Sequence, residues 1–205
     1  MGFLEFRKRF IEGGCFSTNQ VKAVFPGFQS NNLSRWTEKG LLVKLRNGYY
    51  IFPEYMSEPG VQYYAANRIY KPSYISLHSV LAFYGIIPET VVQITSVTTL
   101  KTDFFENTLG EFSYKSVLPE LFFGYEKKKF MKRLTFLFAF PEKALIDLLY
   151  LYPFYDNERE IRELRLDEDV LHEVIDLKRL ELFTKQAGKK VIEKRVKIFR
   201  KVYGL

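Results

Sequence analysis

The sequence has 205 residues, 47% hydrophobic and 27% charged, a balance typical of a globular protein with one domain or two small ones. It has no apolar run near the roughly 20 residues of a membrane-spanning helix, and no apolar region of a secretory signal follows its N-terminal charges. A single cysteine, Cys15, excludes an internal disulfide, so we expect a cytoplasmic protein.

Charge is distributed unevenly along the chain, whose net charge is +7. Residues 1–53 carry eight basic and three acidic side chains. Residues 54–177 carry thirteen basic and nineteen acidic side chains, and residues 178–205 carry ten basic and two acidic ones. Basic ends around an acidic middle favour contact of the N-terminal part, and of the tail, with an anionic polymer such as nucleic acid. A solvated, solubilising surface is the alternative interpretation.

Two short helices are predicted at the N-terminus. Phenylalanines recur at three- and four-residue spacing over residues 3–12, which indicates an amphipathic helix. Ser17 and Gln20 have the spacing of a capping box for a second helix, which Pro26 ends.

A third helix is predicted over about residues 30–39. Ser30 is its expected cap, and Gly40 is its expected left-handed end. Leu33 and Trp36 are expected to face the core, because they lie one turn apart on one side of the helix.

The segment LLVKLRNGYYIFP, residues 41–53, predicts a β-hairpin whose two-residue turn is Asn47 and Gly48. Strand alternation places its side chains on two opposite faces. The expected core face holds Val43, Leu45, Tyr50 and Phe52. The expected open face is basic and aromatic and holds Lys44, Arg46, Tyr49 and Ile51.

Three short helices followed by a hairpin is the order of a winged helix-turn-helix, although similar helices also occur in bundles that bind no DNA. We therefore predict a winged helix-turn-helix DNA-binding domain over residues 1–56. Pro53, Pro59 and Gly60 mark a boundary, and a larger mixed α+β domain is predicted over residues 60–205. The predicted fold class is α+β, with basic helices at the C-terminus.

The larger part mixes helical and strand patterns. Helices are predicted at 61–70, at 76–85 with Ser76 as cap, at 141–152 opened by Pro141, at 177–188 between Asp176 and Gly188, and at 189–204. Strands are predicted at 91–100, 111–117 and 133–140. The segment YEKKKFMKR, residues 125–133, is interpreted as a solvated hairpin end, with a second nucleic-acid contact as the less favoured interpretation.

The sequence indicates neither a metal site nor an active site. His78 and His172 lie far apart, without the spacing of metal ligands, and no glycine-rich phosphate loop is present. Asp103, Glu106 and Glu111, with Lys115, match no nuclease spacing. We therefore expect no cofactor, no metal and no catalytic activity.

The third helix carries residue types that recognise base edges. Because Asn pairs with adenine and Arg with guanine in the major groove, Asn31, Asn32 and Arg35 are predicted to contact bases. The other predicted contacts, with phosphates or flanking positions, are Gln29, Ser34, Lys39, Asn19, Lys22, Lys44, Arg46, Asn47 and Tyr49. For each residue the alternative is an ordinary hydrated surface.

Five stretches, in order along nearly the whole chain, resemble the AbiEi antitoxin family of type IV toxin-antitoxin and phage-defence systems. They are LLVKLRNGYYIF, PSYISLHSVLAFYGIIPE, SYKSVLPELFFGY, FPEKALIDLLY and IDLKRLELFTKQAGKKVIEKRV. The resemblance implies a winged helix that binds double-stranded DNA at the promoter of its own operon and represses it. It places this role on Asn31, Asn32, Arg35, Lys44 and Arg46.

The resemblance further implies a C-terminal domain with antitoxic activity against a nucleotidyltransferase-like toxin, without requiring direct contact between the two proteins. It assigns no residue to antitoxicity. Two alternatives stay open: a winged-helix regulator without a toxin partner, and a nucleic-acid-processing enzyme that uses the carboxylates of the middle region.

Overall fold

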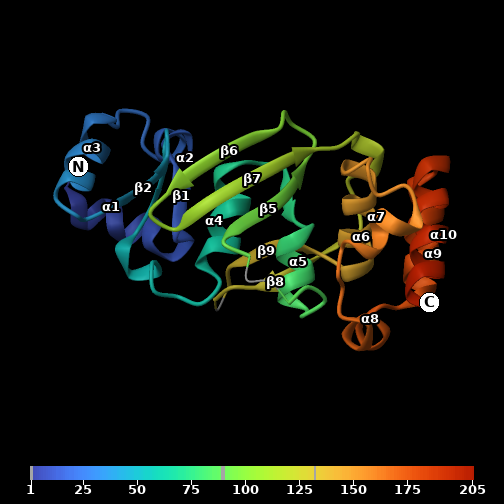
Figure 1. The fold of residues 1–205 in the computed structure, drawn as a ribbon. Coiled ribbons are helices and arrows are strands. Elements are labelled where there is room, and N and C mark those ends of the chain that lie inside the picture. Colours follow the sequence, from blue (N-terminus) through green and yellow to red (C-terminus); the bar gives the residue numbers. More distant parts are fainter. Residues whose placement is uncertain (1, 89–90, 132) are drawn as a thin grey trace.

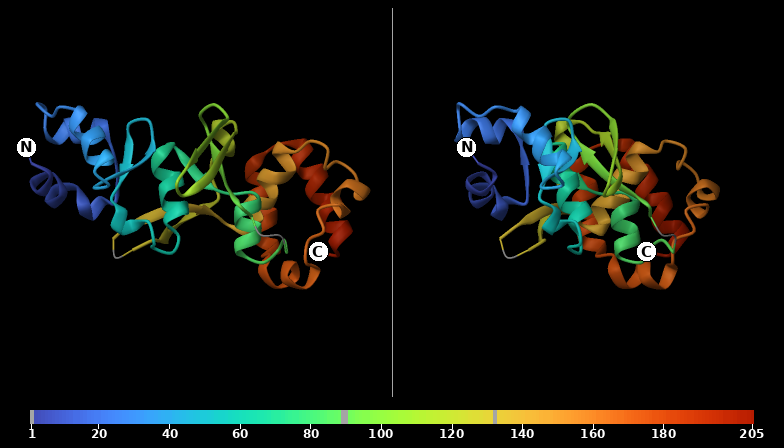
Figure 2. Two further views of the ribbon diagram at one scale, coloured as in Figure 1. Left: turned by 60° about the vertical axis from the view of Figure 1, so that its left-hand side comes forward. Right: turned by 90° about the vertical axis from the view of Figure 1, so that its left-hand side faces the viewer.

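A computed structural model describes residues 2–88, 91–131 and 133–205 (Figure 1). The fold is mixed α+β, as predicted from the sequence. An N-terminal group of helices with a small sheet, a larger sheet, and a C-terminal group of helices follow one another along an elongated molecule (Figure 2). Lys132, in the predicted hairpin end, lies outside the described residues. No helix in the described ranges is long and apolar enough to cross a membrane.

The N-terminal unit, residues 2–52, packs three helices against a three-stranded antiparallel sheet. The helices are α1 (Phe3–Phe10), which a 3₁₀ turn (Ile11–Gly13) follows, α2 (Thr18–Val24) and α3 (Asn31–Glu38). The strands are β1 (Cys15–Ser17), β2 (Val43–Arg46) and β3 (Tyr49–Ile51), in the order β1-β3-β2. Phe6 lies at the centre of an aromatic core, with its ring 4.7 Å from Trp36 and 6.2 Å from Phe52.

Local sequence signals explain where these helices begin and end, with one exception. The capping box is confirmed: Gln20 N donates to Ser17 Oγ at 3.2 Å, and Ser17 N donates to Gln20 Oε1 at 2.8 Å. Gly40 has the predicted left-handed conformation (φ +68°) after α3. Ser30 is at the predicted N-cap position of α3, but its backbone is helical rather than extended and its side chain makes no capping hydrogen bond with the described residues.

A β-bulge in β2 changes the faces of the hairpin. The predicted turn at Asn47 and Gly48 is present, but Lys44 pairs with Tyr50 and Val43 with Ile51. A regular ladder from this turn would instead pair Lys44 with Ile51, so the bulge shifts the register by one residue.

The predicted face assignment is therefore wrong for part of the hairpin. Tyr50 and Phe52 belong to the core of the N-terminal unit, whereas Leu45 and Ile51 are buried in the larger core of the molecule. Val43 also packs against that larger core. Each face of the hairpin thus contributes buried residues, and the hairpin joins the two cores.

A six-stranded sheet forms the middle of the molecule, in the order β6-β7-β5-β4-β9-β8. The strands are β4 (Ser73–Ile75), β5 (Gln93–Thr98), β6 (Asp103–Asn107), β7 (Gly110–Ser116), β8 (Tyr125–Lys129) and β9 (Thr135–Ala139). The β5/β7 and β4/β9 pairs are parallel, and the other pairs are antiparallel. Strands β5, β7 and β9 were predicted. Lys127, Lys128 and Lys129 of the predicted hairpin end lie within β8, where charge protects an edge strand from pairing with other chains.

Helices cover the middle sheet and form the C-terminal end. They are α4 (Val61–Ile69), α5 (His78–Phe83), α6 (Pro141–Leu151), α7 (Glu158–Arg162), α8 (Glu168–Val174), α9 (Leu177–Ala187) and α10 (Lys190–Tyr203). Short 3₁₀ turns occur at Pro53–Tyr55 and Pro119–Leu121. Helix α4 packs on β4 and β9, and α10 packs against α6, α7 and α9.

The predicted helix starts at Pro141 and after Asp176, and the predicted helix end at Gly188, are confirmed. The prediction that Ser76 caps α5 is wrong, because its side chain is drawn into a buried hydrogen bond.

A buried ion pair connects the middle sheet to α6. Lys143 and Asp147 lie one helical turn apart, with side chains 0% and 2% exposed, and form an ion pair. The Tyr74 hydroxyl donates to Asp147 Oδ2 at 2.9 Å and accepts from Lys143 Nζ at 2.8 Å, and the Ser76 hydroxyl donates to Asp147 at 2.7 Å. Burial lowers the pKa of the Lys143 ammonium, while the carboxylate of Asp147 raises it. These partners offset the cost of removing two charges from water.

We predict that Asp147→Ala lowers the free energy of unfolding by about 3–5 kcal/mol, because the Lys143 ammonium is then buried without its counterion. The double variant Lys143→Met/Asp147→Leu removes both charges and is expected to be clearly more stable than Asp147→Ala. Urea unfolding followed by circular dichroism measures both. A double variant as unstable as the single one would contradict this account of the pair.

Candidate nucleic-acid interface

Helix α3 has one buried side and one open side. Leu33 and Trp36 are 1% and 9% exposed and lie in the aromatic core. The exposed side chains on the opposite side, which recur at three- and four-residue spacing, are Asn31, Ser34, Arg35 and Glu38. The open side therefore presents an amide, a hydroxyl and a guanidinium in one row, next to a single carboxylate.

Asn32 lies away from this row. It is half-buried and lines a recess with Gln29, Phe25 and Glu5, near the turn between α2 and α3. Consecutive residues of a helix are about 100° apart around its axis. Asn32 therefore lies at the flank of the exposed row that begins with Asn31. Gln29 is exposed at the same flank, and Lys39 is exposed at the C-terminal end of α3.

The bulge places Lys44 and Arg46 on opposite sides of the small sheet. Lys44 is exposed and pairs with Tyr50, whose ring belongs to the same core as Leu33 and Trp36. Lys44 therefore shares its side of the sheet with the helices. Arg46 pairs with Tyr49 on the other side, which faces the middle sheet.

The prediction that Arg46 lies on an open face is wrong. Its guanidinium donates to the Ile69 carbonyl at 2.8 Å, and its Cζ lies 4.0 Å from the centre of the Phe105 ring and 5.1 Å from that of Tyr70. Tyr49 is half-buried and packs against the larger core. Both side chains therefore hold the N-terminal unit against the middle sheet.

The tip of the hairpin is held beside the start of α2. Thr18 N donates to the Gly48 carbonyl at 2.8 Å, and the Thr18 hydroxyl donates to the same oxygen at 3.3 Å. Asn47 is exposed next to this contact, as are Asn19 and Lys22 on α2. The predicted flanking residues thus lie on the two elements that surround α3 in the sequence.

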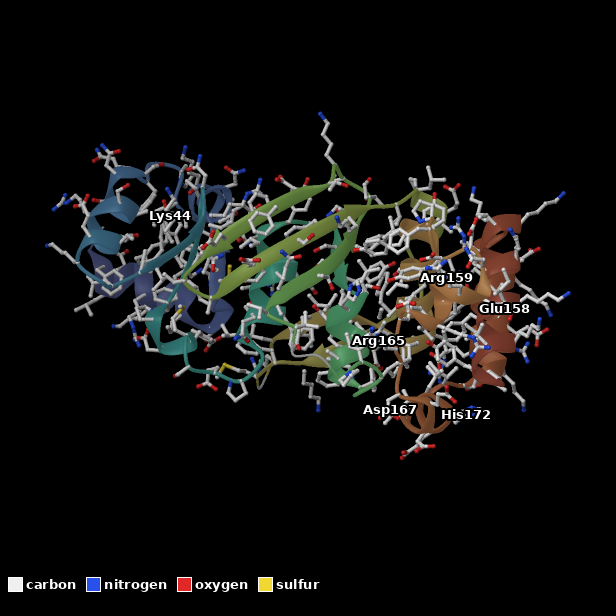
Figure 3. The ribbon with its side chains drawn as sticks, viewed as in Figure 1. Lys44, Glu158, Arg159, Arg165, Asp167 and His172 are labelled. Carbon is white, nitrogen blue, oxygen red and sulfur yellow. The ribbon has the colours of Figure 1, made fainter. Side chains whose placement is uncertain are left out.

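The basic tail lies far from this surface. Figure 3 places Lys44 in the N-terminal unit, and Glu158 and Arg159 at the opposite end of the molecule, near α10. Lys201 of α10 forms an ion pair with Glu158 there, whereas Lys190 and Lys194 of the same helix are exposed. The two basic regions of the sequence therefore form separate surfaces.

The described carboxylates of the middle region do not gather into a metal site. Glu106 and Glu111 are paired across β6 and β7, and Glu111 accepts a hydrogen bond from the Gln93 amide at 3.2 Å. Among the residues with assigned positions, no group of three or more His, Cys, Asp or Glu side chains could hold a metal ion.

The side chains of His172, His78 and Cys15, which could in principle be reactive, make contacts within the fold. His172 Nε2 lies 2.9 Å from the Tyr203 carbonyl, and the His78 ring packs edge-on against Tyr152. Cys15 is 5% exposed, and burial raises the pKa of its thiol to about 12. Because the thiolate is the reactive form, Cys15 is an inert core residue.

Sequence reasoning missed two polar clusters. The first is the buried pair of Lys143 and Asp147, for which the four-residue spacing in a helical pattern was an available signal. The second lies at the end of α4, around Arg68 and Lys71. The sequence shows that these two cations are three residues apart, but it does not show which residues surround them. No family model matches the chain, and no curated protein matches it.

We predict that Arg46→Ala lowers the free energy of unfolding by about 2–3 kcal/mol, because it removes a charged hydrogen bond and a cation–π contact between the two cores. The matched control Lys44→Ala removes an exposed lysine from the same strand and is expected to change stability by no more than about 0.5 kcal/mol. Chemical unfolding compares the two variants. Equal stability of the two would show that Arg46 does not fasten the hairpin.

Proposed function

We propose that this protein binds double-stranded DNA in a sequence-dependent manner through its N-terminal unit, acting as a winged helix-turn-helix. The observation that carries the proposal is the open side of α3, where Asn31, Ser34 and Arg35 are exposed opposite the buried Leu33 and Trp36. A helix that is held from one side and exposes groups for adenine and guanine on the other is suited to the major groove.

The arrangement of the N-terminal unit supports this proposal. Helices α2 and α3 follow one another across a short turn, and the β2–β3 hairpin comes directly after α3, with β1 completing a small sheet. This order is that of a winged helix, in which the second helix of the pair enters the groove. The hairpin serves as the wing, although its two-residue turn makes it short.

Two kinds of contact follow from the exposed residues. Asn31 and Arg35 are the proposed base contacts, and Ser34, Lys39 and Lys44 are the proposed phosphate contacts. Asn47, Lys22 and Asn19 are placed for flanking phosphates. We leave Arg46, Tyr49 and Asn32 out of the direct interface, because Arg46 and Tyr49 pack between the two cores and Asn32 lies at the flank of α3.

The proposed biological role is repression of the promoter of its own operon and neutralisation of a nucleotidyltransferase-like toxin. This role rests on the resemblance of the ordered stretches to the AbiEi antitoxin family. A regulator without a toxin partner is the alternative, since the same open side of α3 would serve it equally well.

We predict that Arg35→Ala weakens binding to the promoter DNA by about 1–3 kcal/mol and relaxes sequence preference, because a two-point contact with guanine is lost. Lys44→Ala should weaken binding to all sequences alike and reduce the salt dependence by about one counterion. Fluorescence anisotropy titrations across salt concentrations, with specific and scrambled duplexes, separate the two effects.

The control for this titration is Lys190→Ala, which removes one exposed positive charge at the far end of the molecule. It should bind both duplexes as the wild type does. Wild-type affinity of both Arg35→Ala and Lys44→Ala would overturn the proposed interface.

The toxin arm of the proposal predicts two separable activities. Co-expression of the full chain with a nucleotidyltransferase-like toxin encoded beside it should restore growth and silence a reporter driven by the operon promoter. Arg35→Ala/Lys44→Ala should release the reporter yet still restore growth, because these residues lie outside the C-terminal part. Failure of the wild-type chain to restore growth would refute the antitoxin role while leaving the DNA titration to decide the rest.

A further inference from the structure

A recess of about 520 Å³ opens at the junction of α4, β4 and β9. Its lining includes Arg68, Lys71 and Asn67, from the last turn of α4 and the residues that follow it. Pro72 and Leu137 contribute apolar surface to the lining. Its volume lies within the range of small-molecule sites, and it is separate from the open side of α3.

Within the described part of the chain, the two cations of this recess have no counterion. Neither Arg68 nor Lys71 forms an ion pair with any residue whose position is described. Burial lowers the pKa of the Lys71 ammonium, and the neighbouring charge of Arg68 lowers it further. Two like charges held together in a partly desolvated place repel one another, and a bound anion would relieve this repulsion.

Neighbouring groups add hydrogen-bond donors to these charges. Asn67 is 7% exposed, and its Oδ1 accepts from Leu137 N, but its Nδ2 has no hydrogen-bond partner among the described atoms. Unpaired buried donors are rare in folded proteins. The guanidinium of Arg68 lies 4.9 Å from the centre of the Tyr64 ring, a cation–π contact that helps to hold it in place.

We propose that this recess binds a phosphate monoester that carries an aromatic or apolar group, such as a nucleoside monophosphate. Arg68 and Lys71 would hold the phosphate, because guanidinium and ammonium groups are the side chains that bind phosphate most strongly. Pro72 and Leu137 would contact the apolar part of the ligand.

Isothermal titration of the full-length protein with AMP, inorganic phosphate and adenosine tests the proposal. The wild type should bind AMP saturably, inorganic phosphate should compete, and adenosine, which lacks the charge, should bind much more weakly. Lys71→Gln and Arg68→Gln/Lys71→Gln should weaken AMP binding, the double variant by about tenfold or more, because charged hydrogen bonds are lost. Lys71 is exposed, so the single variant should fold normally.

The matched control is Lys190→Gln/Lys194→Gln, which removes two exposed positive charges from α10 and should leave AMP binding within about twofold of the wild type. Three outcomes would overturn the proposal. They are no saturable binding of AMP or phosphate by the wild type up to about 10 mM, unchanged AMP binding by Arg68→Gln/Lys71→Gln, and loss of duplex DNA binding by that variant without loss of AMP binding.

Discussion

The β2–β3 hairpin is the connection on which the arrangement of the molecule depends. One of its faces contributes Tyr50 and Phe52 to the core of the N-terminal unit, and the other buries Leu45 and Ile51 in the larger core. Arg46 strengthens the second contact through the Ile69 carbonyl and the Phe105 ring. A hairpin that contributes buried residues from both faces cannot swing freely, so it sets the direction in which α3 points.

The fixed hairpin decides which charged side chains are exposed to solvent and which have partners inside the protein. Lys44 and Arg46 lie two residues apart on one strand, yet the bulge leaves Lys44 in solvent on the side of the helices and directs Arg46 toward the middle sheet. Lys143 and Asp147 likewise have their partners inside the protein, since their buried pair joins α6 to the middle sheet. Exposed basic residues without such partners, among them Arg35 on α3 and Lys71 after α4, keep the capacity to bind external ligands.

Local signals predicted much of the fold, because they act within a few residues. The capping box of Ser17 and Gln20, the Asn47–Gly48 turn and the helix starts at Pro141 and Asp176 are set by backbone hydrogen bonds and by φ preferences. The bulge at Leu45 and the role of Ser76 were not predictable in this way, because distant residues decide them. For the candidate site, the exposure of Asn31, Ser34 and Arg35 followed from helical spacing, whereas the packing of Arg46 depended on Phe105, almost 60 positions along the chain.

The central claim, that the open side of α3 meets DNA, is tested most directly by attaching an iron–EDTA cleavage reagent at that side. The buried thiol of Cys15 leaves a newly introduced cysteine as the reactive one. A Ser34→Cys conjugate bound to the promoter fragment should cut the DNA over one short run of base pairs, and a Lys190→Cys conjugate at the far end should give no localised cleavage. Localised cleavage from Lys190→Cys alone, with none from Ser34→Cys on bound DNA, would contradict the account.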